Sequence, residues 1–295
     1  MAAEGYFPAG TSVLRRVHSE RAVGLLYGQR ALAIGALAPL NFIGTLNHTR
    51  GRATPFERLT RTGKMFETIF FGSRDEADRV LAAVHGMHDR VNGVLAEGSG
   101  AHPAGTPYSA HDPELMLWTI AVAADSARTF YELLVGPLTE SERDAFWADY
   151  VRFGELFGMP REVAPGSHAQ FREYFRGRIE SSEAHLSADA RRLSVAIMFQ
   201  IPVPAPNAPA MQLHNLLIRG SLPPRVREIF GLSWTPAHVL GFNATVAAVR
   251  ASRPIVPVAL RRGKNTSFFN QVRDTERRRH ARGEPIPGAL AVAAD

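Results

Sequence analysis

Apolar residues recur along most of this chain at intervals of three and four, the spacing of one face of an α-helix. Two capping boxes mark helix starts, Ser73 with Glu76 and Thr139 with Glu142. Asp112 followed by a proline marks a third start. The pattern predicts helices over residues 74–95, 115–134, 140–157, 167–180, 188–199, 211–218, 224–230 and 236–251.

Alternating patterns typical of strands are confined to short proline-containing pieces such as residues 255–258. We therefore expect an all-α protein whose residues 1–260 form a single helical domain. After Leu260 arginine, lysine, asparagine and glycine dominate, and no apolar stripe remains that could join a core. Residues 261–295 are predicted to form an Arg-rich C-terminal arm, either lying on the surface or disordered.

The most apolar stretch runs from Val23 to Leu46 and is interrupted by Gln29 and Arg30. The remaining run, residues 31–46, is shorter than the roughly 20 residues that a membrane-spanning helix needs. We expect a buried helix here and no transmembrane segment. The first residues lack a basic region followed by an apolar one, so the sequence predicts no secretory signal and a cytoplasmic protein.

Charge and composition narrow the possible functions. The 295 residues include 34 Lys and Arg against 28 Asp and Glu, a net charge of +6, but only Lys64 and Lys264 are lysines. The arginines are dispersed among acids, and the one long basic run is residues 277–280, so we do not expect nucleic-acid binding. The absence of cysteine excludes disulfides, thiolate-ligated metals and cysteine nucleophiles.

Several familiar catalytic motifs are missing from the sequence. There is no G-x-S-x-G, no G-x-x-x-x-G-K-[ST], no G-x-G-x-x-G after a strand and no H-E-x-x-H. None of the eleven histidines has a glutamate three residues before it, as a di-iron carboxylate bundle would require. Hydrolase, nucleotide-binding and ferritin-like functions are therefore disfavoured.

His88 is one of two places where polar residues lie on an otherwise apolar helix face. On the helix predicted after Ser73, His88 falls within about 40° of the apolar face centred on Val84, and His85 lies at its edge. A buried imidazole needs a hydrogen-bond partner or a metal. Three interpretations remain open: a histidine bonded to a backbone carbonyl, a zinc ligand together with His85, or the axial ligand of a haem iron.

Arg58, Arg61 and Thr62 form the second such place. Thr62, Met65 and Ile69 define one helical stripe, which Arg58 extends by a turn with Arg61 beside it. A guanidinium on an apolar face needs an anionic partner. Arg58 either pairs with an acid such as Glu57 at the helix end, or Arg58, Arg61 and Thr62 line a buried cavity that receives a propionate and dioxygen.

A set of short motifs in a fixed order resembles the mpaB-type oxygenases, the family that includes the latex-clearing rubber oxygenases. The motifs are Tyr6-Phe7-Pro8, Arg58-x-x-Arg61-Thr62, Phe71-Gly72, His88-x-x-Val91-x-Gly93, Tyr108-Ser109-Ala110-x-Asp112-Pro113-Glu114-Leu115-x-Leu117-Trp118 and Asp125-Ser126. The resemblance extends over about residues 5–255.

This resemblance implies a globin-like all-α fold around an apolar pocket for haem b, and oxygenative cleavage of double bonds in isoprenoid chains. His88 matches the histidine that ligates the haem iron. Arg58 and Thr62 match the R-x-x-x-T pair on the facing side, which polarises dioxygen or holds a propionate, and Arg61 stands where rubber oxygenases carry lysine. We thus expect dioxygen and a hydrophobic, lipid-like molecule as the substrates.

The sequence departs from the family pattern at two places. Many relatives read Trp-x-His-Ala-Thr where this chain has Trp118-Thr119-Ile120-Ala121-Val122, and residues 40–46 lack the carboxylate expected ahead of the Arg/Thr helix. These departures favour an alternative in which the same fold binds haem for storage or sensing without turnover. A third hypothesis is a haem-free helical interaction protein.

Overall fold

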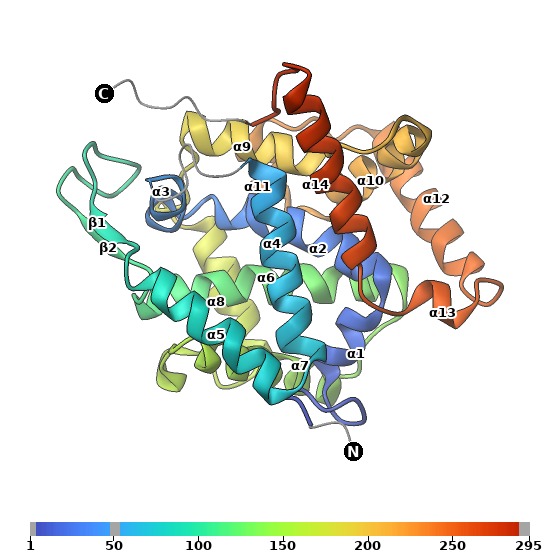
Figure 1. Cartoon of the computed structure of the whole chain (residues 1–295), viewed down its shortest axis with the longest axis horizontal. Helices are drawn as coiled ribbons and strands as arrows, with labels where there is room; N and C mark the ends of the chain where they lie inside the picture. The colour runs from blue at the N-terminus through green and yellow to red at the C-terminus, as the bar shows by residue number, and fades with distance from the viewer. Residues whose placement is uncertain (1–3, 48–53, 289–295) are drawn as a thin grey trace.

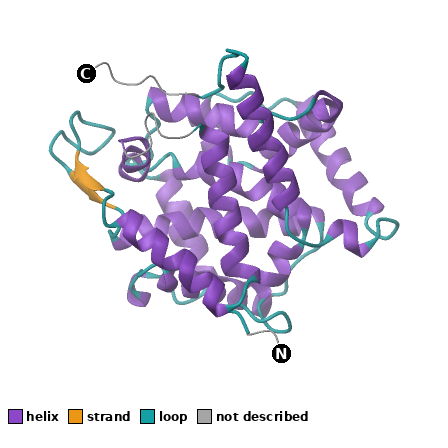
Figure 2. Ribbon diagram, viewed as in Figure 1, coloured by secondary structure: helices purple, strands orange, loops and turns teal. Residues whose placement is uncertain are grey.

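The computed structural model describes residues 4–47 and 54–288, and these are mostly helical (Figures 1 and 2). The helices are α1 (Val13–Ser19), α2 (Arg21–Gly35), α3 (Pro39–Asn47), α4 (Pro55–Phe71), α5 (Arg74–His88), α6 (Pro113–Leu134), α7 (Glu140–Leu156), α8 (His168–Glu180), α9 (Ala188–Phe199), α10 (Ala208–Ser221), α11 (Pro224–Phe230), α12 (Pro236–Ser252), α13 (Val258–Arg261) and α14 (Thr266–Ala281). Two strands, β1 (Asn92–Val94) and β2 (Pro107–Ser109), form an antiparallel pair. The prediction of an all-α protein is confirmed.

Local capping interactions explain why several helices begin where the sequence predicts. The Ser73 hydroxyl accepts a hydrogen bond from the Glu76 amide, and the Glu76 carboxylate accepts one from the Ser73 amide. Thr139 and Glu142 make the same reciprocal pair at the start of α7. The Asp112 carboxylate accepts hydrogen bonds from two amides of the first turn of α6. Each of these three caps supplies a hydrogen-bond acceptor to amides that have no partner within the helix.

The predicted extent of the helix after Ser73 was wrong at its C-terminal end. α5 ends at His88, and the residues that follow form β1 rather than a further turn of helix. The Val91 carbonyl accepts a hydrogen bond from the Ala110 amide at 2.8 Å. A Cβ on Gly93 would come within 2.8 Å of the Tyr108 hydroxyl, so a larger residue here would require the Tyr108 side chain to shift. Val91 and Leu95 fit a helical spacing, but pairing across the hairpin determines their conformation.

The core is centred on α2, which packs mainly against α6 and also against α9 and α10. The predicted buried helix over residues 31–46 is instead divided between α2 and α3, because α2 ends at Gly35 and α3 begins at Pro39. Large aromatic side chains of α6 and α7, including Trp118, Phe130, Trp147 and Tyr150, are fully buried around this centre. No helix in the described ranges is both long and apolar enough to cross a membrane.

The described part of the predicted C-terminal arm contains α14, and its final residues, 289–295, lie outside the described residues. α14 packs along α4 (Figure 1) and buries Val272, Thr275 and Glu276. The Glu276 carboxylate accepts hydrogen bonds from the Thr54 hydroxyl and from the Phe56 and Glu57 amides, the first amides of α4. α14 thus supplies the cap that α4 lacks locally.

A buried histidine gives the fold a testable pH dependence. His18 Nε2 lies 2.7 Å from the Tyr150 hydroxyl, and the His18 ring packs against Tyr27 and Phe70. Burial lowers the pKa of His18 to about 3. Between that value and the ordinary pKa of about 6.5 the unfolded chain binds the proton and the folded chain does not, so acid destabilises the fold.

We expect a His18→Gln variant to lose part of this pH dependence. His18 contributes a slope of up to about 1.4 kcal/mol in the free energy of unfolding for each pH unit below about 6. Urea unfolding between pH 7 and pH 5 measures the slope for wild type and variant. His280→Gln, an exposed histidine on α14, serves as the control and should keep the wild-type slope. Equal slopes for His18→Gln and wild type would contradict the assignment.

Candidate functional site

Helices α4 and α5 diverge from their connection at Gly72 and Ser73 and form an open V (Figure 1). A groove of about 360 Å³ lies between them near this connection. It is lined by Met65 and Thr68 of α4 and by Glu76, Arg79, Val80 and Ala83 of α5. Thr62 lies one turn before Met65, and Met87 lies one turn after Ala83, so both walls continue away from the connection. The V therefore offers two facing helix surfaces separated by a mainly apolar groove.

Phenylalanine rings lie close to both arms of the V. The Phe66 ring of α4 packs edge-on against Phe153 of α7 with ring centroids 5.0 Å apart, and Phe157 contacts both Phe66 and Phe153. The Phe157 ring also lies 6.4 Å from the His88 ring. A continuous chain of phenyl rings therefore connects α4 with the end of α5, and a flat apolar group could stack in such surroundings.

His88 is the last residue of α5 and is half-buried. Burial lowers its pKa, and the neighbouring imidazoles of His111 and His85 lower it further. His88 Nδ1 is buried and has no hydrogen-bond partner among the described residues. The side chain is therefore a neutral imidazole at pH 7, and the backbone-bonded histidine considered from the sequence does not account for this nitrogen.

His85 lies one turn before His88, and its Nε2 is likewise buried without a partner within the described residues. In those residues no three histidine or carboxylate side chains gather in an arrangement that could hold a metal ion. The structure thus supplies no third ligand for the zinc site considered from the sequence. A haem iron differs, because the porphyrin supplies four ligands and the protein needs to supply only one.

The three predicted residues of α4 differ in exposure. Arg58 is half-buried, and burial lowers the pKa of its guanidinium, with the positive charge of Arg61 lowering it further. Arg61 and Thr62 are exposed, so they do not line a closed cavity as expected from the sequence. Glu57, the acid suggested as a partner for Arg58, forms an ion pair with Arg277 of α14. These residues form one open, positively charged wall of the V.

His111 is a neighbour of the site that the sequence did not single out. Its Nε2 lies 2.9 Å from the Asp89 carboxylate, and its ring packs edge-on to His88 with centroids 6.1 Å apart. His111 follows β2, and Asp89 follows α5, so the hairpin brings them together. Only the pairing of β1 with β2, which the sequence pattern did not predict, reveals this contact.

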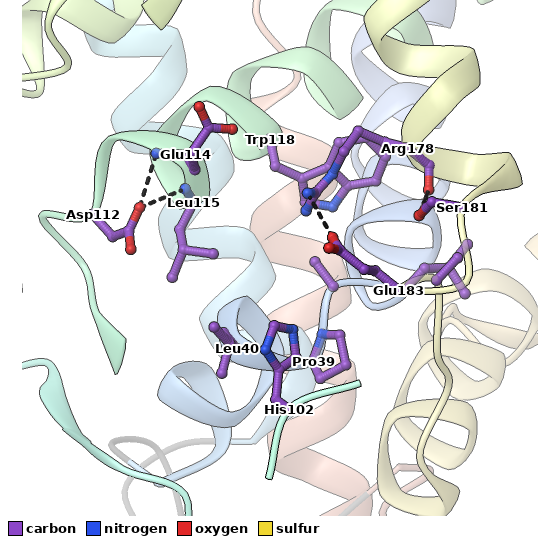
Figure 3. Close-up of a pocket in the computed structure, with 13 residues that line it drawn as sticks. Pro39, Leu40, His102, Asp112, Glu114, Leu115, Trp118, Arg178, Ser181 and Glu183 are labelled. Atoms are coloured by element: carbon purple, nitrogen blue, oxygen red, sulfur yellow. Dashed lines mark hydrogen bonds and ion pairs between the residues drawn. The ribbon is translucent and has the colours of Figure 1, made fainter. Parts of the chain in front are cut away.

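A second, smaller cavity of about 140 Å³ lies between α3, the start of α6 and the end of α8 (Figure 3). Arg178 stacks over the Trp118 ring and forms an ion pair with Glu183. Asp112 points its carboxylate at the amides of α6. The main polar groups here serve the structure itself, and none of the predicted site residues lines this cavity.

The fold and the α4–α5 site define an all-α protein with an open, mainly apolar groove between two diverging helices, one carrying Arg58 and Arg61 and the other ending at His88. The family described as "ER-bound oxygenase mpaB/B'/Rubber oxygenase, catalytic domain" matches residues 15–251. This chain belongs to that family, and the resemblance seen in the sequence is confirmed. No curated protein and no solved structure matches the chain.

Two of the residues at which the sequence departs from the family pattern it resembles, Ile120 and Val122, lie in the core rather than in the groove. Ile120 and Val122 are on α6 and are buried. Gly35 of α2 lies against Val122, since a Cβ on Gly35 would be 3.6 Å from its side chain. Aliphatic residues at these positions therefore contribute to the packing of α2 on α6.

Proposed function

We propose that this chain is a haem b-dependent oxygenase that acts on hydrophobic, isoprenoid-like substrates at the α4–α5 site. The observation that carries the proposal is His88, a neutral imidazole with a buried unpartnered nitrogen beside a chain of phenyl rings. Membership of an oxygenase family supports the reaction class. On this proposal the helices provide a globin-like framework for the cofactor.

The residues present suit a haem. His88 would hold the iron, because a neutral imidazole is a ligand that haem iron accepts from proteins. Phe66 and Phe157 offer apolar contact for the macrocycle. When bound, the haem supplies the iron centre at which dioxygen is activated for addition to a carbon–carbon double bond.

The side chains of the α4 wall would perform the remaining tasks. Arg58, Arg61 and Thr62 are hydrogen-bond donors, and they would orient dioxygen and stabilise negative charge that develops on it. The apolar lining of the groove, including Met65 and Val80, would bind an isoprenoid chain and exclude water from its double bond. The products of such a cleavage carry carbonyl groups.

The first test is an electronic spectrum together with oxygen uptake. The purified protein should show a Soret band and should consume oxygen when squalene, an isoprenoid with isolated double bonds, is added. A Soret band without uptake would favour the alternative, a non-catalytic haem-binding or sensing protein, which the aliphatic Ile120 and Val122 support. A colourless protein that takes up no haem would contradict both.

We expect Arg58→Gln to keep the Soret band and to lower oxygen uptake with squalene about a hundredfold, because one donor to the developing charge is lost. An oxygen electrode measures the rate, and the spectrum measures haem content in the same sample. Arg192→Gln, at an exposed arginine of α9, is the matched control and should retain full uptake. Unchanged uptake in Arg58→Gln would remove Arg58 from the reaction.

A further inference from the structure

Helix α12 is apolar and yet contributes no fully buried residue. Its inner side packs on α10 and α6 through Phe242, Val246 and Val249, which are partly buried. Its outer side carries Leu240, which is 73% exposed, followed at helical spacing by Ala244, Ala247 and Ala251. The solvent-facing side of a helix is normally rich in charged residues, whereas the outer side of α12 has Arg250 as its one exposed charged residue.

The apolar surface continues beyond the end of α12. Ile255 is 82% exposed in the connection to α13, and Val258 and Leu260 of α13 are 55% and 66% exposed. α12 and α13 form the outer edge of the molecule on the side opposite the β1–β2 hairpin (Figure 1). We call the exposed side chains of Leu240, Ile255, Val258 and Leu260 the α12–α13 edge.

The segment of the chain that forms this edge carries only positive charges. Residues 229–273 contain six arginines and lysines and no aspartate or glutamate. Because the whole chain has 34 basic and 28 acidic residues, this segment accounts for its entire net charge of +6. Five of the six, Arg250, Arg253, Arg261, Arg262 and Lys264, lie within or directly after α12 and α13. Glu20 of the α1–α2 junction pairs with Arg253 and Arg262, which leaves the edge positively charged.

We propose that the α12–α13 edge binds the surface of an anionic lipid membrane. Exposed aliphatic side chains flanked by arginine and lysine match the two layers of such a surface, with acyl chains below and anionic headgroups around them. A fluid lipid surface adapts to the shape of such an outer edge, whereas a rigid protein partner would need a surface that matches it.

A second copy of the chain is a poorer partner for this edge, because like charges would face each other. In a twofold dimer the same patch meets itself, so arginines and lysines would face arginines and lysines with no carboxylate in residues 229–273 to pair with them. The membrane proposal does not depend on the proposed oxygenase reaction, because none of its residues belongs to the α4–α5 site.

Cosedimentation of the full-length protein with lipid vesicles tests the proposal. We expect binding to mixed phosphatidylserine–phosphatidylcholine vesicles, weaker binding at high salt, and little binding to pure phosphatidylcholine. The triple variant Ile255→Ser, Val258→Ser, Leu260→Ser should bind at least about tenfold more weakly, since three apolar side chains no longer enter the interface.

The matched control is Val94→Ser, at an equally exposed apolar residue of β1 on the opposite side of the molecule, which should bind as wild type does. Circular dichroism of each variant checks that it is folded. Three results would overturn the proposal: no binding to anionic vesicles, wild-type binding by the folded triple variant, or a concentration-dependent dimer in sedimentation velocity that the triple variant abolishes.

Discussion

A His88→Ala variant is expected to purify without the Soret band that the wild-type protein carries. The proposed iron ligand is a neutral imidazole at the end of α5, and the substitution removes that imidazole. The helical fold should persist, because His88 is half-buried and its Nδ1 has no hydrogen-bond partner in the described residues. Absorbance at the Soret maximum, normalised to protein concentration, measures the loss.

Two further variants make this prediction specific to His88. His85→Ala removes an imidazole from the same helix one turn earlier and should keep the band, because the resemblance to the family assigns the ligand to His88. His88→Gly leaves a space that free imidazole can enter, so adding imidazole to that variant should restore haem binding. A normal Soret band in His88→Ala, or its loss in His85→Ala alone, would contradict the assignment.

The helix starts could be predicted from the sequence because their causes are local. The hydroxyl and carboxylate of Ser73 and Glu76, or of Thr139 and Glu142, lie three residues apart and interact only when a helix begins between them. The end of α5 could not be predicted in this way. It depends on hydrogen bonds between residues near Val91 and residues near Ala110, which the spacing of apolar residues does not report.

The role of α14 could not be predicted either, because it depends on contacts with residues still farther away in the sequence. Its role depends on Glu276, which accepts hydrogen bonds from the first residues of α4, about two hundred residues earlier in the chain. Residues 266–281 are strongly polar, and of their large apolar residues, Phe268, Phe269 and Val272, only Val272 is fully buried. A buried carboxylate that caps another helix cannot be recognised from the composition of its own segment.

The sequence indicated which residues belong to the candidate site but not how they are arranged in space. His88 and Arg58 were identified because each interrupts an apolar stripe, and both are half-buried on the facing helices. The periodicity of α4 did not show that Arg61 and Thr62 face solvent, because exposure depends on how far α5 diverges from α4. Phe157 reaches His88 from the end of α7, a contact that only the packing of three helices produces.

Arg30 was visible in the sequence as an interruption of the apolar stretch from Val23 to Leu46, and the structure supplies its partner. Its guanidinium lies 2.7 Å from the Asp125 carboxylate and donates hydrogen bonds to the Ser126 hydroxyl and the Ser221 carbonyl. Arg128 binds the other oxygen of Asp125 at 2.8 Å and is itself paired with Glu132. The network joins α2, α6 and α10 inside the core.

Asp125→Asn is expected to destabilise the fold by about 3–5 kcal/mol, because it keeps the shape of the side chain and leaves buried guanidinium charge uncompensated. Burial by itself would raise the pKa of Asp125, but Arg30 and Arg128 outweigh burial and lower it, so the carboxylate is charged at pH 7. Urea unfolding followed by circular dichroism measures the change. Glu228→Gln, which removes the acid of an exposed ion pair with Arg225, is the control and should cost less than about 1 kcal/mol.

The double variant Arg30→Met, Asp125→Leu separates the cost of an unpaired charge from the value of the pair. The double variant removes both charges of the Arg30–Asp125 ion pair at once, and Arg128 keeps Glu132 as its partner. We expect the double variant to be more stable than Asp125→Asn, since apolar side chains often replace a buried ion pair with little loss. If the stability of Asp125→Asn lies within about 1 kcal/mol of wild type, the charge of Asp125 does not hold the network together. If instead the double variant is the least stable of the three, the ion pair itself contributes more to the packing of α2 on α6 than its desolvation costs.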